Sequence, residues 1–325
     1  MKQVLLVTFA PMNRMRGRHV ELLASSGLEV RRLDRDEPYT TDELVPLVGD
    51  VDAIIAGGER FDARLFAAAP SLKVLSRHGV GYDAVDVDAA TRAGVVVTIT
   101  PGANAVSVAE LALGLMIALA RRIPQRMSAL LAGDWSRRPG IELAGKTLGL
   151  VGLGNIGRAV AVRASAFDMR VMAHDVAPDE AFARAHGVEL ASFERVLREA
   201  DIVSLHVPAI AGAPPIVGPD QFSAMKRNAF LLNTARGSLV DEDALLDALE
   251  RKLIAGAALD VFANEPPGRH PLFGRDDVVL TPHIGGTIEA GERTATMAVR
   301  NALQVLRGER CASTVNPDVY EKRRR

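Results

Sequence analysis

Three charged side chains, each placed soon after an apolar run, are the residues of this sequence best suited to catalysis. They are Arg236, Glu265 and His283. A histidine titrates near neutral pH and can give a proton to a carbonyl oxygen. An arginine offers a planar fork to a carboxylate, and a carboxylate beside the histidine would orient its ring and favour its protonated form. Together the three residue types suit hydride transfer to a ketone that carries a carboxylate.

A glycine-rich turn indicates where the hydride carrier would bind. Residues 152–157 read Gly-Leu-Gly-Asn-Ile-Gly, directly after a predicted strand at 147–151 and at the start of a predicted helix. The first glycine allows a tight bend, the second lets backbone approach a pyrophosphate, and the third permits close packing of helix on sheet. The predicted cofactor contacts are therefore Gly152, Gly154, Asn155, Ile156 and Gly157. Alone, the motif also fits a ligand-free turn, or a nucleotide-sugar or methyl-donor site.

An acidic residue at the end of the next predicted strand selects between the two nicotinamide dinucleotides. Asp175 lies 18 residues beyond Gly157, and residues 176–180 contain no Arg or Lys. A carboxylate there can accept hydrogen bonds from the adenosine ribose and would repel a 2′-phosphate. We therefore predict NAD rather than NADP.

Taken singly, the three charged residues have ordinary interpretations. An arginine between strand and helix is usually a surface charge, a glutamate before Pro266 and Pro267 is usually a loop residue, and a lone histidine after a strand is usually packed. Their joint placement beside a dinucleotide loop favours catalysis, because open α/β sheets bind ligands where their strands end.

Short, nearly continuous apolar runs alternate with helical segments along most of the chain, which predicts an α/β fold with parallel sheets. The predicted strands are 4–8, 29–33, 52–56, 73–76, 95–98, 147–151, 170–174, 202–206, 230–233, 255–259 and 278–281. The predicted helices are 14–25, 41–48, 62–68, 86–93, 107–121, 156–167, 192–199, 221–225, 241–251 and 288–306. We predict two doubly wound parallel-sheet domains, with residues 1–100 and 286–325 in a discontinuous first domain and 101–285 in the second. A ligand cleft between them is the default expectation.

Composition limits the possible partners and the compartment. The chain has 39 basic and 40 acidic side chains, so nothing in its net charge favours nucleic acid or an anionic membrane. The apolar stretch at 111–120 is too short to span a bilayer. A single cysteine, Cys311, excludes an intrachain disulfide and fits a reducing, cytoplasmic location. The seven histidines show no metal-ligand spacing, so we expect no metal.

The sequence resembles the D-isomer-specific 2-hydroxyacid dehydrogenases, in particular the phosphoglycerate dehydrogenase-like branch. The resemblance covers nearly the whole chain. It is carried by SRHGVGYD at 76–83, TPGAN at 100–104, VAE at 108–110, GLGNIG at 152–157, NTARG at 233–237, ALDVF at 258–262 and TPHIG at 281–285.

The resemblance implies a Rossmann NAD-binding domain inserted into a flavodoxin-like substrate domain, and a homodimer joined through the cofactor domain. It matches Arg236, Glu265 and His283 to the family's catalytic residues. It implies that the amides of Val80 and Gly81 hold the substrate carboxylate together with Arg236. The remaining cofactor contacts that it implies are His206, Val207, Pro208, Thr234, Ala235 and Asp260.

Some features depart from the family or stay open. Residues 209–215 replace the family's more usual Leu-Thr-Pro-x-Thr run, and the stretch after His283 is one residue shorter than in many relatives. We expect no regulatory C-terminal domain of the kind found on some phosphoglycerate dehydrogenases. Arg60 and Arg77 are candidates for a second anionic group of the substrate, and His78 faces either substrate or solvent. Trp135 is expected at an interface.

Three functions fit these features. The first is a reversible NADH-dependent reduction of a 2-keto acid, with 3-phosphoglycerate or glyoxylate and hydroxypyruvate as candidate substrates. The second is an NAD(H)-sensing, corepressor-like binding protein. The third is a formate or phosphite dehydrogenase of the same fold.

Overall fold

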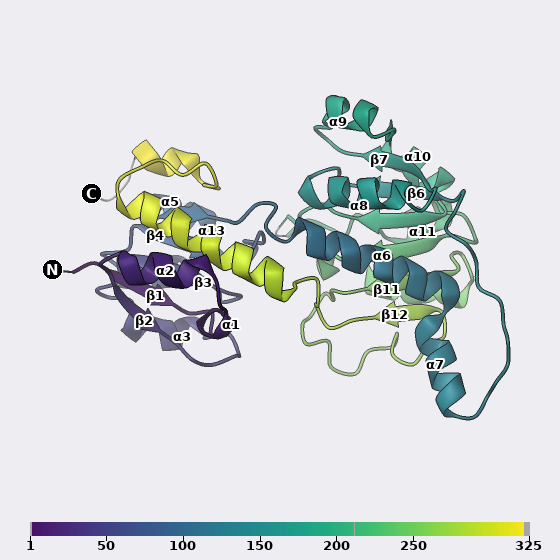
Figure 1. The fold of residues 1–325 in the computed structure, drawn as a ribbon, viewed down its shortest axis with the longest axis horizontal. Coiled ribbons are helices and arrows are strands. Elements are labelled where there is room, and N and C mark those ends of the chain that lie inside the picture. The colour runs from purple at the N-terminus through teal and green to yellow at the C-terminus, as the bar shows by residue number, and fades with distance from the viewer. Residues whose placement is uncertain (1, 211, 322–325) are drawn as a thin grey trace. The chain divides into compact units, whose positions relative to one another are not determined.

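The computed structural model describes residues 2–210 and 212–321 and divides the chain into two compact units, each with its own parallel sheet (Figure 1). Unit 1 contains the chain up to Asn104 together with the residues from Thr287 onward, and unit 2 runs from Ala105 to Gly286. Ala211, within the atypical 209–215 stretch, lies outside the described residues.

Unit 1 is built on five parallel strands in the order β2-β1-β3-β4-β5. β1, β3, β4 and β5 are buried throughout, as their continuous apolar runs predict. The strands are β1 (Val4–Val7), β2 (Glu29–Arg32), β3 (Ala53–Ala56), β4 (Val74–Arg77) and β5 (Val96–Thr98). The α-helices are α1 (Pro11–Arg14), α2 (Arg18–Ser25), α3 (Thr41–Leu44), α4 (Ala63–Ala68), α5 (Val87–Arg92) and α13 (Ile288–Leu306).

One predicted helix of unit 1 is wrong in extent. The predicted helix 14–25 is instead the end of α1, at Arg14, followed by the separate helix α2 from Arg18 to Ser25, because the backbone turns between them at Gly17 with φ of 135°. That conformation is open to glycine and strained for other residues, so the chain bends where the apolar pattern alone suggests a continuous helix. α13 packs beside α2 and against β4, so the C-terminal helix completes the core of unit 1.

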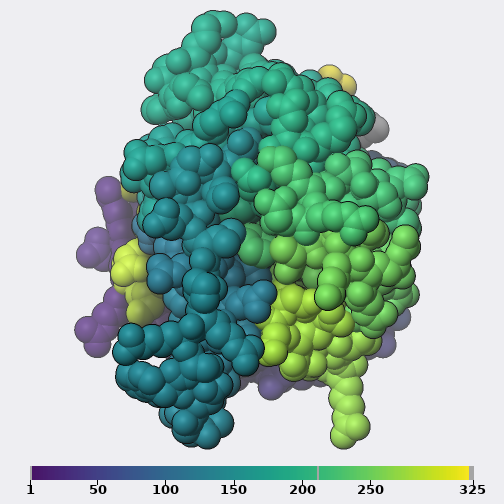
Figure 2. Space-filling view, turned by 90° about the vertical axis from the view of Figure 1, so that its right-hand side faces the viewer, coloured from purple at the N-terminus to yellow at the C-terminus, as the bar shows by residue number. Residues whose placement is uncertain are grey.

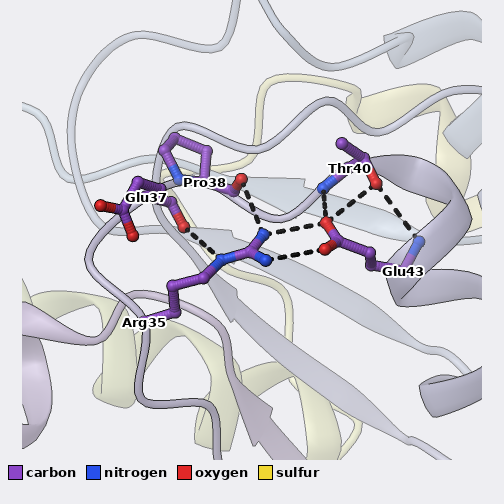
Figure 3. Close-up of polar contacts among 5 residues, drawn as sticks. All are labelled: Arg35, Glu37, Pro38, Thr40 and Glu43. Carbon is purple, nitrogen blue, oxygen red and sulfur yellow. Dashed lines mark hydrogen bonds and ion pairs between the residues drawn. The ribbon is translucent and has the colours of Figure 1, made fainter.

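The start of α3 shows how local sequence fixes an element (Figure 3). Thr40 and Glu43 form a reciprocal capping box, with the Glu43 carboxylate accepting from the Thr40 amide at 2.8 Å. Arg35 grips the same carboxylate with two hydrogen bonds of 2.7 and 2.9 Å. The hydrogen bond from Arg35, aided by those from Thr40, lowers the pKa of Glu43 to about 2.

Unit 2 is built on seven parallel strands in the order β12-β11-β10-β9-β6-β7-β8. The strands are β6 (Thr147–Val151), β7 (Arg170–His174), β8 (Glu189–Leu190), β9 (Ile202–Leu205), β10 (Phe230–Asn233), β11 (Gly256–Leu259) and β12 (Val278–Leu280). The α-helices are α6 (Ala105–Arg121), α7 (Ile123–Leu131), α8 (Asn155–Ser165), α9 (Glu180–Ala185), α10 (Phe193–Glu199), α11 (Pro219–Ala224) and α12 (Glu242–Glu250).

The predicted fold class, two doubly wound parallel-sheet α/β domains, is confirmed. Three elements were not predicted from the sequence: α7, whose apolar side chains are exposed, the six-residue helix α9, and the two-residue edge strand β8. Within the described part of the chain, no helix has both the length and the apolar character needed to cross a membrane.

Candidate active site

The site residues predicted in unit 2 lie where its parallel strands end. The last residues of the strands are aligned across the sheet, with Val151 beside His174 and Leu205, and Leu259 beside Asn233 and Leu280. Because the strands are parallel and end together, the residues that follow them share one edge. The strand order also reverses about β6, which lies between β7 and β9, and such a switch point is where doubly wound sheets bind ligands.

Glu265 and His283 form a direct pair. The Glu265 Oε2 atom lies 2.7 Å from His283 Nδ1, and Glu265 Oε1 accepts a hydrogen bond of 3.0 Å from the Phe262 amide. Both carboxylate oxygens are therefore oriented, one by the loop backbone and one by the imidazole. The His283 side chain is 54% exposed, so its ring remains accessible to a ligand.

Asp260 fixes the chain segment that carries His283. Its side chain is buried and accepts hydrogen bonds from the Thr281 hydroxyl at 2.6 Å and from the amides of Ile284 and Gly285 at 2.8 and 3.0 Å. The His283 amide donates to the Asp260 carbonyl at 2.8 Å. His283 itself has a φ of 54°, a conformation that costs about 1–3 kcal/mol and persists where surrounding contacts impose it.

Arg236 follows β10 on a loop that packs tightly on the Glu265 loop. A Cβ atom on Gly237 would lie 1.9 Å from the Phe262 carbonyl carbon, so only glycine allows this approach. The Asn233 side chain supports the turn by donating to the Arg236 carbonyl at 2.7 Å and accepting from the Ala235 amide at 3.0 Å. The sheet thus brings Arg236 beside the loop that holds the Glu265–His283 pair.

The glycine loop has the shape that a dinucleotide requires. A Cβ on Gly152 would lie 2.5 Å from the His206 carbonyl oxygen, and one on Gly157 would lie 2.1 Å from the Gly152 carbonyl oxygen. A Cβ on Gly154 would meet no atom within 4 Å, so this side of the loop is open to a ligand. Asn155 and Ile156 begin α8, whose N-terminus can face a pyrophosphate. The residues present therefore fit NAD.

Asp175 lies next to the glycine loop, where its Oδ2 atom accepts from the Leu153 amide at 2.7 Å. Residues 176–180 contain no Arg or Lys, but the structure places Arg158, from α8, beside the same loop. Arg158 donates from Nε to the Leu153 carbonyl at 2.9 Å and pairs with Asp179 at 3.0 Å. Arg158 follows Gly157 directly, so its place one residue past the motif is the signal that could have found it.

The remaining predicted cofactor contacts lie after β9 and β10. Burial lowers the pKa of His206 to about 4, and its Nε2 atom lies 2.9 Å from the Ser204 hydroxyl. Val207 is half-buried against the core, Pro208 is exposed, and Ala235 is half-buried. The Thr234 hydroxyl is buried and has no hydrogen-bond partner among the described residues, so it is available to a ligand.

The loop after β4, in unit 1, contains Val80 and Gly81, and both are half-buried. Arg77 is buried and donates from Nε to the Gly81 carbonyl at 3.2 Å. His78 does not face solvent. Its ring packs on the ring of Phe9, with the two centroids 4.5 Å apart, and burial lowers the pKa of His78 to about 4. Arg60, Arg77 and His78 were the three residues whose contact with substrate the sequence did not decide. Arg60 is the exposed one of the three.

The described residues contain no group of three His, Cys, Asp or Glu side chains that could hold a metal ion.

Comparison with known proteins agrees with this geometry. Residues 113–285 match the family model "D-isomer specific 2-hydroxyacid dehydrogenase, NAD binding domain". The chain is 41% identical over 301 residues to a D-3-phosphoglycerate dehydrogenase of Methanocaldococcus jannaschii, and the match covers 91% of this chain and 57% of that protein. It is also 41% identical over 299 residues to a glyoxylate reductase of Thermofilum pendens, covering 89% and 88%.

Solved structures share the fold over nearly the full length. The TT0316 protein from Thermus thermophilus has a TM-score of 0.85 and 40% identity, covering 96% of this chain and 100% of that one. The predicted NAD cofactor is confirmed at the level of the domain, because the matched model is that of an NAD-binding domain.

Proposed function

Because this chain belongs to the D-isomer-specific 2-hydroxyacid dehydrogenase family, we propose that it interconverts a small D-2-hydroxy acid and its 2-keto acid, with His283 as general acid and base. Two predictions are confirmed: that the chain belongs to this family, and that it is an NAD-dependent oxidoreductase. The observation that carries the proposed mechanism is the 2.7 Å contact between His283 Nδ1 and Glu265 Oε2.

The pair leaves one ring nitrogen for the reaction. With Nδ1 turned to Glu265, Nε2 is the atom that gives a proton to the carbonyl oxygen in reduction and removes it from the hydroxyl in oxidation. The Glu265 carboxylate stabilises the imidazolium by charge attraction and fixes the ring. Bound NAD(H) supplies or accepts the hydride.

Arg236 is proposed to hold the substrate carboxylate. Its guanidinium can make two parallel hydrogen bonds to a carboxylate, which orients the neighbouring carbonyl as well as binding the acid. The amides of Val80 and Gly81 are proposed to add backbone donors to the same group. The cofactor is proposed to contact the predicted residues that follow the ends of β6, β7, β9, β10 and β11 in the chain.

The names of the two relatives indicate two classes of substrate, a phosphorylated hydroxy acid and a smaller hydroxy acid. The chain spans about half of the phosphoglycerate dehydrogenase and most of the glyoxylate reductase. A phosphate on the substrate would need a second cation, and Arg60 is the exposed candidate. We propose a small 2-keto acid, and retain 3-phosphoglycerate as the alternative that depends on Arg60.

An NADH-consumption assay tests this proposal. Glyoxylate, hydroxypyruvate, pyruvate and phosphohydroxypyruvate are supplied in turn, with wild type, His283→Ala and Arg60→Ala. Turnover of a 2-keto acid that falls about 10²–10⁴-fold in His283→Ala is the expected result. Loss of phosphohydroxypyruvate turnover alone in Arg60→Ala would select the alternative substrate. NAD binding without turnover of any acid, or NAD reduction with formate or phosphite, would overturn the proposal.

We also propose a homodimer formed through unit 2. α7 and the chain after it form a lobe that projects from the rest of this unit (Figures 1 and 2). The lobe exposes large apolar side chains, with Leu131 and Trp135 81% and 72% exposed. Large apolar side chains gathered on one exposed segment are typical of protein interfaces. Light scattering should give twice the chain mass, and Trp135→Ala with Leu131→Ser should lower it.

A cytoplasmic location is proposed from the cysteine content alone. Cys311 is a free, buried cysteine, and chains that work in oxidising compartments usually carry disulfides. Fractionation of the producing cell, with the chain followed by antibody, checks this.

A further inference from the structure

A second glutamate–histidine pair, Glu242 and His270, contacts the loop that carries Glu265. Glu242, the first residue of α12, accepts a hydrogen bond from the Ala263 amide at 2.8 Å through Oε1. Its Oε2 atom lies 3.0 Å from His270 Nε2. Both side chains are largely withdrawn from solvent, at 13% and 18% exposed for His270 and Glu242. One carboxylate therefore ties together both ends of the segment in which Glu265 lies.

The hydrogen-bond network assigns the His270 tautomer. The Leu272 amide lies 3.3 Å from His270 Nδ1, so Nδ1 is an acceptor and Nε2 carries the hydrogen that is donated to Glu242. The imidazole also packs against Phe262 and Phe273, with ring centroids 5.7 and 5.8 Å away. The ring is thus held by its contacts on several sides.

Two successive amides of this loop are used by two glutamates. The Phe262 amide donates to Glu265 Oε1, and the next amide, that of Ala263, donates to Glu242 Oε1. The orientation of Glu265 therefore depends on a short backbone stretch, Phe262 and Ala263, which Glu242 holds in place through the Ala263 amide. The described contacts place neither Glu242 nor His270 against His283, so any effect on the reaction passes through the loop.

We infer that Glu242 and His270 are positioning residues, which clamp the 262–270 loop so that Glu265 stays on His283. The inference rests on the proposed function, because it concerns the orientation of the proposed acid–base pair. A misplacement of reacting groups by about 1 Å can cost about 10²-fold in rate. The clamp therefore acts on the proton-transfer step rather than on cofactor binding.

Two substitutions test the clamp with little change in shape. In Glu242→Gln the side chain keeps one oxygen, so it can satisfy the Ala263 amide or His270 but not both. His270→Phe keeps an aromatic ring beside Phe262 and Phe273 and loses the Nε2 donor. Asp243→Asn, an exposed neighbour on the first turn of α12, is the matched control because it removes the same charge, and the contacts of the described residues do not link Asp243 to the loop.

Both substitutions should lower kcat for 2-keto acid reduction about 10- to 100-fold, with the KM for NADH and the melting temperature close to wild type. They should also move the pH at which the reduction rate is halved, and the pH midpoint of the His283 ring signal in NMR, to lower values. A purely structural role would lower the melting temperature and leave both pH midpoints in place. Asp243→Asn should match wild type in every measurement.

Glu265→Gln, measured in parallel, separates failure of the clamp from failure of the proposed function. If Glu265→Gln shifts the pH profile while Glu242→Gln and His270→Phe do not, the clamp is refuted and the proposed pair stands. If Glu265→Gln itself leaves the profile unchanged, the proposed pair is refuted and the clamp with it. Should Glu242→Gln fail to fold, His270→Phe alone decides between these outcomes.

Discussion

The Asp175 carboxylate accepts a 2.7 Å hydrogen bond from the amide of Leu153, which lies inside the glycine loop. Its other oxygen accepts from the Ala177 amide at 2.9 Å. Each carboxylate oxygen can accept two hydrogen bonds, so one site on each remains for a ribose hydroxyl. The residue predicted to select the cofactor therefore also fixes the shape of the phosphate-binding loop.

Replacing Asp175 by alanine should raise the ratio of kcat/KM for NADPH to that for NADH by about 10-fold or more. The carboxylate would no longer repel a 2′-phosphate or accept from the ribose, and a hydrogen bond to a charged group contributes about 1.5–3 kcal/mol. The loop loses a support as well, so kcat/KM for NADH should fall. Steady-state kinetics with both cofactors measures the ratio, and an unchanged ratio would remove Asp175 from cofactor selection.

Asp175→Asn is the control that separates charge from loop support. Its side-chain oxygen can still accept from the Leu153 amide, so the loop should be retained while the negative charge is lost. The NADPH/NADH ratio should rise in this variant as well, with a smaller fall in kcat/KM for NADH than in Asp175→Ala.

Arg236→Lys should lower kcat/KM for the keto acid by about 10-fold or more without destabilising the fold. Lysine keeps the charge but cannot make the two parallel bonds of a guanidinium to a carboxylate. Melting temperature and kcat/KM, measured on the same sample, test this. Arg251→Lys, on the exposed surface just after α12, is a matched control that should leave both unchanged. A fully active Arg236→Lys enzyme would remove Arg236 from substrate binding.

The sheets were predictable because buried parallel strands are nearly continuous apolar runs, and β6, β7 and β10 begin and end where the sequence indicates. The glycine loop and the residues that follow each strand were predictable for a related reason, since parallel strands end at one edge. The long helix α13 was predictable over its full extent because small and apolar residues recur at helical spacing between Ala290 and Val305.

The Glu242–His270 contact could not be predicted, because its partners lie 28 residues apart and neither sits in a motif. The Arg158–Asp179 pair escaped for a similar reason, since only the folded turn shows which acidic residue meets the arginine. The sequence does not decide between substrate and solvent for His78, because no local pattern reveals that Phe9 covers its ring. Contacts between distant loops depend on side-chain packing that periodicity does not encode.

Asp201 should stabilise unit 2 in a pH-dependent way. Burial alone would raise the pKa of this carboxyl, but the hydrogen bonds from Lys226 at 2.8 Å and from the Thr147 amide at 2.9 Å outweigh it, and the pKa lies below the usual 3.8. A carboxyl with a lowered pKa in the folded state stabilises the fold above its unfolded pKa, and this contribution is lost as the pH falls through the folded value.

Asp201→Asn should therefore lower the free energy of unfolding by about 1 kcal/mol at pH 7. The difference from wild type should shrink as the pH falls below about 4. Urea denaturation at several pH values measures it, with Asp276→Asn, an exposed position, as the control. A difference that stays constant from neutral pH to about pH 3 would contradict the role of the ionised carboxylate.

The Glu265–His283 pair should act as a single unit in catalysis. His283→Ala should remove most of the rate, about 10²–10⁴-fold, while NADH still binds. Glu265→Gln keeps the side-chain shape but removes the charge that favours the protonated ring. The reduction rate, which needs protonated His283, should then fall off at lower pH than in wild type.

The rate of hydroxy-acid oxidation should depend on pH in the opposite direction to the rate of reduction. It needs neutral His283, so in Glu265→Gln it should begin at lower pH than in wild type. The double variant should be little slower than His283→Ala, because residues that act as a unit are not additive. Rate profiles in both directions test the pairing, and a Glu265→Gln profile that superimposes on wild type would show that the 2.7 Å contact has no part in proton transfer.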